Sequence, residues 1–268
     1  MKYSARVAVI DADILLYKAC RSAEEEVDWG NDQWLLWSDL DTVKHIIDDQ
    51  VDSLVEDMNA DRTILCFSDK ENFRKHINPE YKANRKGGRK PICFKAALEY
   101  CKEQYPYRQF TNLEADDVIG IIATTENDNE YVIVSEDKDL LTVPGYHWDL
   151  KKKEIYFLSE EEADFNFFAQ TLTGDAVDNY KGCPNVGRIT AEKLLRAAVN
   201  ETRSFNLWET VVKRFEKAGL TEDDALLNAR MARILRKCEY DRKNNKVILW
   251  KDNKIIHEPN LWRTNDKL

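Results

Sequence analysis

Nine acidic residues stand where they could act together on a phosphate ester. Each follows an apolar segment that could be a strand, or lies where a helix could begin. They are Asp11, Asp69, Glu114, Asp116, Asp117, Asp137, Asp139, Asp175 and Asp178. Carboxylates gathered in one place cannot all stay ionised unless cations neutralise them. Because oxygen-only ligand sets select hard divalent ions, this group predicts a magnesium site in which manganese can substitute.

Each acid also has a simpler explanation when it is taken alone. The acids at 114–117 would favour the N-terminus of a helix, and those at 137–139 suit a turn after a strand. Asp175, after Gly174, would serve as a helix cap. These local explanations do not predict that every strand should end in an acid. The shared placement therefore favours one common site.

The elements that must position these acids follow from the apolar periodicity. Buried strands are expected at 6–10, 63–67 and 131–134, helices at 14–20, 43–58, 94–104 and 113–125, and a strand hairpin at 146–157. Thr111 and Glu114 predict a capping box for the fourth helix. From residue 159 the pattern is mostly helical, which predicts an α/β fold with a mostly parallel central sheet flanked by helices. In such sheets ligands bind beyond the carboxyl ends of the strands, so the acids should converge there.

The segment 73–95 is strongly basic, with eight Lys or Arg residues against the single acid Glu80. A chain with a net charge of −9 is unusual for a nucleic-acid binder, but the average hides this local concentration. Phosphodiester cleavage needs positive groups near the phosphorus, and Lys82 and Arg85 could supply them. On composition alone, a solvated basic helix face is the commoner explanation for such a segment.

A Gly-Pro-Gly interruption at 182–187 is expected to form a hairpin between two helices. Gly182 and Gly187 would let backbone N–H groups approach a phosphate, with Arg188 and Lys193 close by. An ordinary helix–helix turn with glycine caps remains the alternative.

Composition excludes several other classes. The six cysteines form no CxxC pair, which favours reduced thiols over zinc or disulfides. The sequence contains no apolar run of membrane-spanning length and no apolar leader, which predicts a cytoplasmic protein. The acidic, Trp-rich stretch 24–37 is expected to be an ordered insertion, and it has no assigned role.

The order of these motifs resembles the flap endonuclease superfamily. The resemblance covers residues 5–195 and is carried by Asp11, Asp69, Tyr81-Lys82-x-x-Arg85, Glu114-Ala115-Asp116-Asp117, Asp137-x-Asp139, Gly174-Asp175-x-x-Asp178 and the Gly-rich hairpin. The stretches 81–86, 219–224 and 231–236 are similar to the 5′→3′ exonucleases of short-tailed bacteriophages. The resemblance to the superfamily implies an α/β nuclease core over 1–158 with a helical arch at about 70–92. A helical region over 159–268, with a DNA-binding hairpin at about 175–197, would follow.

The resemblance also implies a role for each residue. One magnesium would be held by Asp11, Asp69, Glu114 and Asp116, and a second by Asp137, Asp139 and Asp175, with Asp117 and Asp178 in support. Lys82 and Arg85 would contact the scissile phosphate. Further DNA contacts are expected at Tyr17, Lys86, Arg89, Lys90, Gly182, Gly187, Arg188 and Lys193. A potassium ion is expected at the hairpin.

The predicted function is that of a magnesium-dependent 5′→3′ exonuclease that acts as a monomer. It is expected in the cytoplasm, and in the cytoplasm of the bacterial host if the protein is phage-encoded. Its substrate would be double-stranded DNA with 5′ ends, nicks or flaps, cleaved by two-metal hydrolysis to 5′-phosphate products. Flap cleavage and removal of RNA primers from RNA–DNA hybrids would be further activities. The short arch favours action at duplex ends.

Three alternatives remain open at this stage. In a haloacid-dehalogenase-like phosphatase, Asp11 of Ile10-Asp11-Ala12-Asp13 would be the nucleophile, with Ser68 as a second motif. That assignment leaves the acids at 114–117 and the Lys82/Arg85 pair without a role. A non-catalytic binder of DNA structures would be expected to have lost some of the acids. A PIN-type ribonuclease would not need the C-terminal third.

Overall fold

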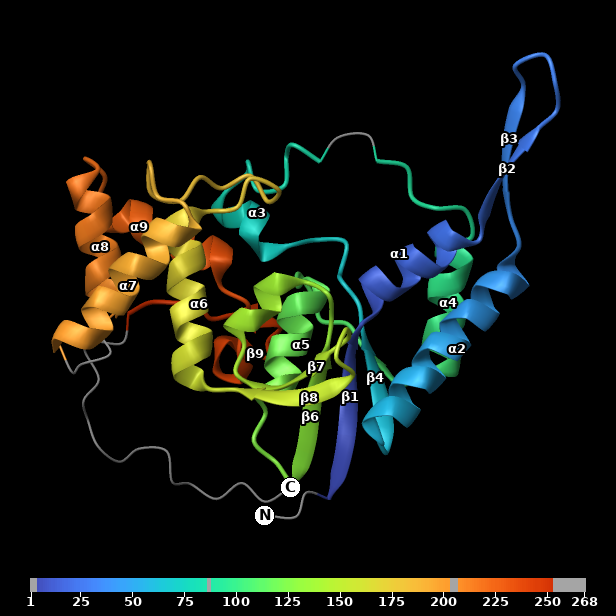
Figure 1. Ribbon diagram of the computed structural model, residues 1–268, viewed down its shortest axis with the longest axis horizontal. Helices are drawn as coiled ribbons and strands as arrows, with labels where there is room; N and C mark the ends of the chain where they lie inside the picture. Colours follow the sequence, from blue (N-terminus) through green and yellow to red (C-terminus); the bar gives the residue numbers. More distant parts are fainter. Residues whose placement is uncertain (1–3, 86–87, 203–206, 253–268) are drawn as a thin grey trace.

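The centre of the computed structural model is a six-stranded sheet (Figure 1); residues 4–85, 88–202 and 207–252 are described. In order across the sheet the strands are β5 (Tyr107–Arg108), β4 (Arg62–Cys66), β1 (Ala5–Asp11), β6 (Asn129–Val134), β7 (Gly145–Asp149) and β8 (Glu154–Leu158). Neighbouring strands are parallel except β7 and β8, which form the expected hairpin. The predicted mostly parallel sheet is confirmed.

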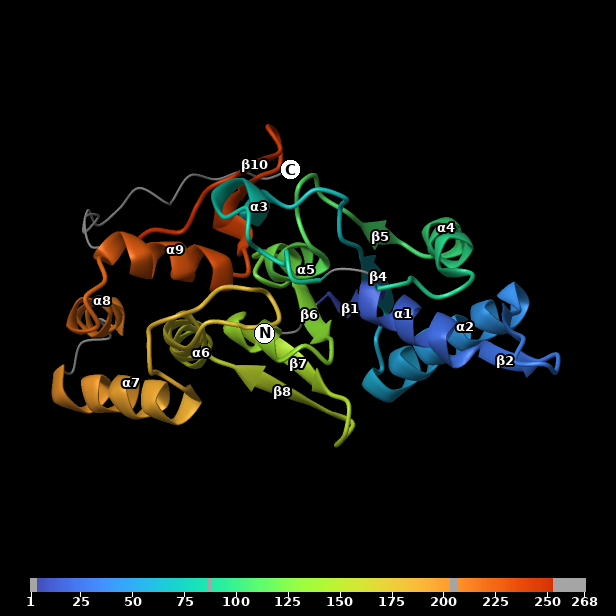
Figure 2. The ribbon, with the colours of Figure 1, turned by 90° about the horizontal axis from the view of Figure 1, so that it is seen from above.

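Helices cover both faces of the sheet, so its central strand is apolar on both sides. Ala8 and Ile10 of β1 pack toward α1 (Ala12–Ser22), α2 (Leu40–Met58) and α4 (Phe94–Gln104). Val9 packs on the opposite side against α5 (Ala115–Ala123). Figure 2 shows α1, α2 and α4 together on one side of the strands, with α5 on the other.

The C-terminal half adds a helical layer with its own apolar core. It consists of α6 (Glu160–Thr173), α7 (Arg188–Thr202), α8 (Leu207–Lys217) and α9 (Glu222–Ala232). Phe167, Trp208 and Phe215 are buried among them. The chain then forms a 3₁₀ turn, η2 (Lys237–Glu239), and a small pair of strands, β9 (Tyr240–Asp241) and β10 (Lys246–Val247). No helix in the described part of the chain is long and apolar enough to cross a membrane.

The capping box predicted at Thr111 is wrong. The helix begins at Ala115 with Glu114 as its N-cap residue, and the Asp117 carboxylate accepts the Glu114 N–H at 3.3 Å. Residues 108–113 instead run beside the chain that leaves β4, where the Asp69 N–H donates to the Leu113 carbonyl at 2.8 Å. The chain before Glu114 is therefore bonded to the segment that follows β4, and Thr111 does not cap the helix.

The Trp-rich insertion is an antiparallel hairpin of β2 (Glu24–Asp28) and β3 (Trp34–Ser38). It projects from the body of the molecule at the upper right of Figure 1. Trp29, Trp34 and Trp37 are all exposed on it. It therefore contributes little to the main core.

The segment between β4 and α4 crosses the molecule above the sheet (Figure 1). Within its described residues the only helix is α3 (Phe73–Ile77), so the expected arch is mostly turns and extended chain. Its far end is fixed to the base of the Trp-rich hairpin. Both oxygens of Glu24 accept from the Arg89 guanidinium, at 2.6 and 2.9 Å, and one also accepts the Ile92 N–H at 2.7 Å.

Candidate active site at the carboxyl edge of the sheet

A cavity of about 310 Å³ opens where the parallel strands end. Asp11 is the last residue of β1, and Asp137 follows β6 by three residues. Seven of the nine predicted carboxylates line the cavity, together with Lys82 and Arg85. They are Asp11, Glu114, Asp116, Asp137, Asp139, Asp175 and Asp178. Acids that are far apart in the sequence thus line one cavity, as the strand directions predict.

Short-range hydrogen bonds fix the backbone around these acids. Asp11 caps α1 by accepting the Ile14 N–H at 3.2 Å, and its second oxygen accepts the Ser135 hydroxyl at 3.0 Å. Asp137 caps a 3₁₀ turn, η1 (Lys138–Thr142), by accepting the Asp139 N–H at 2.8 Å. The two acids therefore sit at element starts, where backbone N–H groups stabilise negative charge.

Asp175 and Asp178 are presented by a closed loop between α6 and α7. The backbone groups of Asp175 and Tyr180 exchange hydrogen bonds of 2.9 and 3.0 Å, which pin the two sides of the loop together. At its neck Gly174 (φ +66°) meets Gly182 (φ +65°), and a Cβ on Gly174 would lie 2.4 Å from the Gly182 nitrogen. Only glycine fits such a backbone crossing.

Burial and mutual repulsion make the cavity unfavourable for negative charge. Burial, then Asp13, raises the pKa of Asp11 to about 6. Burial, then Asp137, raises the pKa of Asp139 to about 6. For Asp116, burial and then the charge of Asp11 raise the pKa well above its ordinary value. Neutralisation by protons or by metal ions relieves this cost.

The side chains that line the cavity are of the type that a hard divalent ion prefers. All the acidic donors are carboxylate oxygens, the ligands that magnesium and manganese prefer. Among the residues that the structure describes, no three His, Cys, Asp or Glu side chains are already gathered closely enough to hold an ion.

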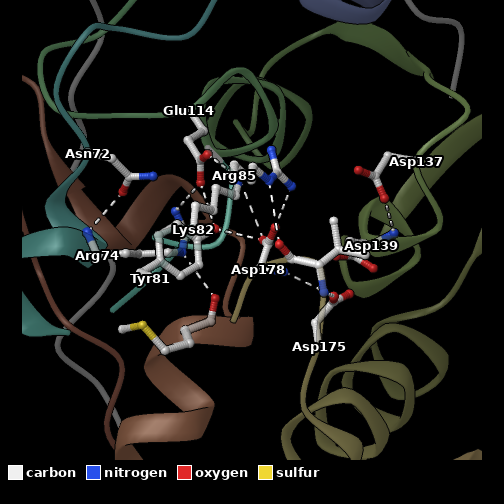
Figure 3. A network of polar contacts seen from close by, with 12 residues as sticks. Asn72, Arg74, Tyr81, Lys82, Arg85, Glu114, Asp137, Asp139, Asp175 and Asp178 are labelled. Atoms are coloured by element: carbon white, nitrogen blue, oxygen red, sulfur yellow. Dashed lines mark hydrogen bonds and ion pairs between the residues drawn. The ribbon is translucent and has the colours of Figure 1, made fainter. Parts of the chain in front are cut away.

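Two cations of the crossing segment neutralise one side of the cavity, as Figure 3 shows. The Lys82 ammonium pairs with Glu114 and lies 3.6 Å from Asp178, and Arg85 donates to Asp178 at 2.6 Å. The Tyr81 hydroxyl lies 2.9 Å from both carboxylates. Burial alone would raise the pKa of Glu114, but the charges of Arg74 and Lys82 hold it at about 2.

Asp117 lies outside this cavity. It is fully buried and forms a two-pronged ion pair with Arg74, at 2.7 and 2.8 Å, while the Leu235 N–H donates to it at 3.1 Å. Arg74 also reaches Glu114 at 3.3 Å. Asp117 therefore acts on the cavity through Arg74, which holds Glu114 in place.

Asp69 does not line the cavity either. Its carboxylate accepts the Asn112 N–H at 2.8 Å, on the side where residues 108–113 run beside it. Ser68 lines the cavity in its place, because successive side chains of an extended segment point to opposite sides. Asp13, which the nuclease assignment did not use, also lines the cavity. Its position two residues after Asp11, in the first turn of a helix, was the available signal.

The DNA-contact residues predicted near the crossing segment are not part of the cavity wall where the structure describes them. Tyr17 is 49% exposed on α1. Arg89 is occupied by Glu24, and the Lys90 ammonium lies 4.4 Å from the centre of the Phe94 ring. Lys86 lies outside the described residues.

The predicted contacts of the Gly-rich hairpin divide into two groups. Gly182 donates its N–H to Asn228 at 2.9 Å, so this group is not free for a phosphate. Gly187 immediately precedes α7 and has open space around it. Arg188 pairs with Glu192 at 2.5 Å, and Lys193 is exposed. The start of α7 is therefore the exposed part of this motif.

Comparisons with known proteins agree with this geometry. The family model described as 5′-3′ exonuclease, N-terminal resolvase-like domain, matches residues 6–165. An exodeoxyribonuclease of Enterobacteria phage T3 is 29% identical over 279 residues, covering 91% of this chain and 92% of that protein. An exonuclease of Escherichia phage T7 is 29% identical over 280 residues, covering 91% and 93%.

The fold has solved counterparts. A bacteriophage T5 flap endonuclease, in a complex with DNA and metal ions, aligns with a TM-score of 0.60. The alignment covers 85% of this chain and 88% of that one at 15% identity, a level at which the likeness concerns the fold. With the family model matching more than half of its length, the chain belongs to the 5′-3′ exonuclease family, and it is a nuclease.

Proposed function

We propose that this protein is a divalent-metal-dependent 5′→3′ exonuclease that hydrolyses double-stranded DNA from 5′ ends and nicks, cleaves 5′ flaps, and leaves 5′-phosphate products. The observation that carries the proposal is a single cavity lined by eight carboxylates together with Lys82 and Arg85. Support comes from the family and from the T5 structure, which was solved with DNA and metal ions. Removal of RNA primers from hybrids, and action as a monomer, belong to the same proposal.

The carboxylates divide into two groups by position. Asp11, Glu114 and Asp116 would hold one magnesium ion, and Asp137, Asp139 and Asp175 the other, with Asp178 in support. When bound, the two ions would activate a water molecule and stabilise charge on the transferring phosphate. Asp117 would act indirectly, by holding Arg74 against Glu114.

The basic side chains would orient the substrate. Lys82 and Arg85 reach the cavity from the crossing segment, so a phosphate bound to the carboxylate-held ions would meet both. Tyr17 offers an exposed ring for stacking against a base at the strand end. Gly187, Arg188 and Lys193 would grip the duplex backbone at the start of α7, and a potassium ion would bind in the adjoining loop.

Digestion of end-labelled DNA tests the proposal directly. Duplex, nicked and 5′-flapped substrates with either a 5′ or a 3′ label would be incubated with magnesium. Early release of the 5′ label as short 5′-phosphorylated products, abolished by a chelator, is expected. Early release of the 3′ label, or cleavage unaffected by the chelator, would contradict it.

Substitution of Asp137 separates catalysis from binding. Asp137→Asn removes a cavity carboxylate and is expected to abolish cleavage while leaving DNA affinity within about threefold, because phosphate contacts come from basic groups. Asp223→Asn, on the exposed first turn of α9, serves as the matched control. Single-turnover kinetics and filter binding provide the two readouts. Near-normal turnover of the Asp137 variant would count against the proposed site.

The phosphatase alternative fits the structure poorly. It leaves Glu114, Asp116 and the Lys82/Arg85 pair, which line the same cavity as Asp11, without a role. The chain also belongs to the 5′-3′ exonuclease family. The non-catalytic alternative fails because the chain is a nuclease by family.

A further inference from the structure

We propose that a basic surface beside the cavity, made of Arg242, Lys243 and Lys246, binds the displaced 5′ single strand of a flapped DNA, an inference that rests on the proposed function. All three side chains are exposed, on the turn between β9 and β10 or at its end. In the part of the chain that the structure describes, none of them forms an ion pair with an Asp or Glu. Exposed cations without an ion-pair partner are the ordinary means of holding a phosphate backbone.

The turn that carries these cations has a fixed shape. The Asp241 carboxylate accepts the Lys243 N–H at 2.9 Å and the side-chain amide of Asn244 at 2.6 Å, so the only acid among residues 240–246 is engaged inside the turn. The Arg242 guanidinium lies 5.1 Å from the centre of the Phe110 ring. Stacking on a ring holds a guanidinium in one orientation and leaves its N–H groups available to a phosphate. The surface is therefore preorganised.

Contacts through the segment before α5 place this turn next to the cavity. The Tyr240 and Phe110 rings are stacked, with their centroids 5.5 Å apart and 15° between their planes. The Tyr240 hydroxyl donates to the Thr111 carbonyl at 3.4 Å. The Leu113 carbonyl accepts, at 2.8 Å, the N–H of the residue after Ser68, and Ser68 lines the cavity. One layer of chain thus separates the basic surface from the cavity wall.

The duplex is expected on the opposite side of the cavity. Its proposed contacts, Gly187, Arg188 and Lys193, lie at or near the start of α7. Figure 2 shows α7 and β10 on opposite sides of α5, whose Asp116 lines the cavity. A strand that is held as duplex at α7, with its scissile phosphate in the cavity, therefore continues toward the basic surface where it is unpaired. A nicked duplex without a flap has no nucleotides to place there.

Binding of two DNAs in the absence of divalent ions tests the inference. The affinity of the full chain would be measured for a nicked duplex and for the same duplex carrying a single-stranded 5′ flap, at several salt concentrations. For Arg242→Gln/Lys243→Gln, binding of the flapped DNA is expected to weaken at least about tenfold, and the slope of log affinity against log salt to fall by about 1.4, the value for two single-strand phosphate contacts. Binding of the nicked duplex should change less than about twofold, because no contact to it is lost.

Lys213→Gln/Lys217→Gln, at exposed positions of α8, removes the same charge and is the matched control. It is expected to leave the difference between the two DNAs unchanged. Circular dichroism checks that both double variants fold. Should Arg242→Gln/Lys243→Gln misfold, Lys243→Gln/Lys246→Gln replaces it, because that variant keeps Arg242 on Phe110.

The inference and the proposed function fail in different ways. If the unaltered protein cleaves neither DNA when magnesium is added, the proposed function fails, and the binding comparison still tests the basic surface. Three binding results would overturn the assignment of this surface to the displaced strand. They are equal affinity of the unaltered protein for the two DNAs, unchanged affinity of the variant for the flapped DNA, and an equal loss of affinity for both.

Discussion

At the scale of single residues, the cavity is a balance between buried carboxylates and two positive groups of the crossing segment. Lys82 and Arg85 neutralise Glu114 and Asp178. Among the described residues no Lys or Arg forms an ion pair with Asp11, Asp116 or Asp139, and burial raises the pKa of each of these three carboxyl groups. The two sides of one cavity are therefore in different electrostatic states. A bound cation would give the largest electrostatic stabilisation on the side where the carboxylates have no ion-pair partner.

Lys82 is the cation closest to the carboxylates, and its removal should affect chemistry more than binding. Lys82→Ala is expected to lower the single-turnover cleavage rate by about 10²-fold or more, the usual effect of losing a fixed electrostatic donor. Lys75→Ala, at an exposed basic residue of α3, is the control. A rate unchanged by the Lys82 variant would argue against a direct role.

The raised pKa values predict how magnesium stabilisation depends on pH. Asp11 and Asp139 have a pKa of about 6 in the folded protein against an ordinary 3.8, so unfolding releases protons between these values. In that window these two groups make the metal-free protein less stable as pH rises. Since ligands must be deprotonated, the increase of Tm caused by magnesium should grow from pH 5 to pH 7.5. Thermal unfolding with and without magnesium checks this; a constant increase would contradict it.

At the scale of elements, much of the fold was predictable because its signals are local. The strands 6–10 and 131–134 and the helix 43–58 show a clear apolar pattern, and the structure contains each within a few residues of the expected bounds. The direction of the Asp69 side chain was not predictable, since it depends on pairing with residues 108–113, which have no strand-like pattern. The closed loop between α6 and α7 was not predictable either, because it depends on the close contact of two glycines that lie eight positions apart in the sequence.

That glycine crossing supplies a prediction for the loop. In Gly174→Ala the new Cβ would meet backbone atoms of Lys181 and Gly182 at 2.4 Å, at a φ of +66°. The variant is expected to lose about 2 kcal/mol or more of stability, from overpacking together with strain, and to lose cleavage activity as Asp175 moves. Gly88→Ala, where no atom lies within 4 Å, should leave the urea midpoint unchanged. Equal midpoints for the two variants would contradict the structural role of the crossing.

At the scale of the whole molecule, Arg74 joins parts of the chain that are remote in sequence. It lies at the base of the crossing segment, pairs with Asp117 of α5, and donates to the carbonyls of Met231 and Arg233 at the end of α9. The sheet domain, the crossing segment and the helical layer therefore meet at one buried guanidinium. The cavity lies beside this junction, through the contact of Arg74 with Glu114.

Breaking this junction should destabilise the entire protein. Arg74→Met leaves Asp117 buried without its ion-pair partner and is expected to cost about 3–5 kcal/mol in the free energy of unfolding. The double variant Arg74→Met/Asp117→Leu, which removes both charges, should recover part of that loss. Urea unfolding measures both. A double variant less stable than the single one would show that the charge pair is not the source of the effect.

A bound magnesium ion and the Lys82 ammonium would compete for the Glu114 carboxylate. The same carboxylate oxygens that magnesium would bind are already engaged by a tethered ammonium group. Occupancy by the ion would displace that group and free its charge for a phosphate, whereas withdrawal of the ion would let it return. If Glu114 binds the ion as proposed, Lys82 would serve as a replaceable counter-ion, and loading of the ion and capture of the nucleic acid would be coupled.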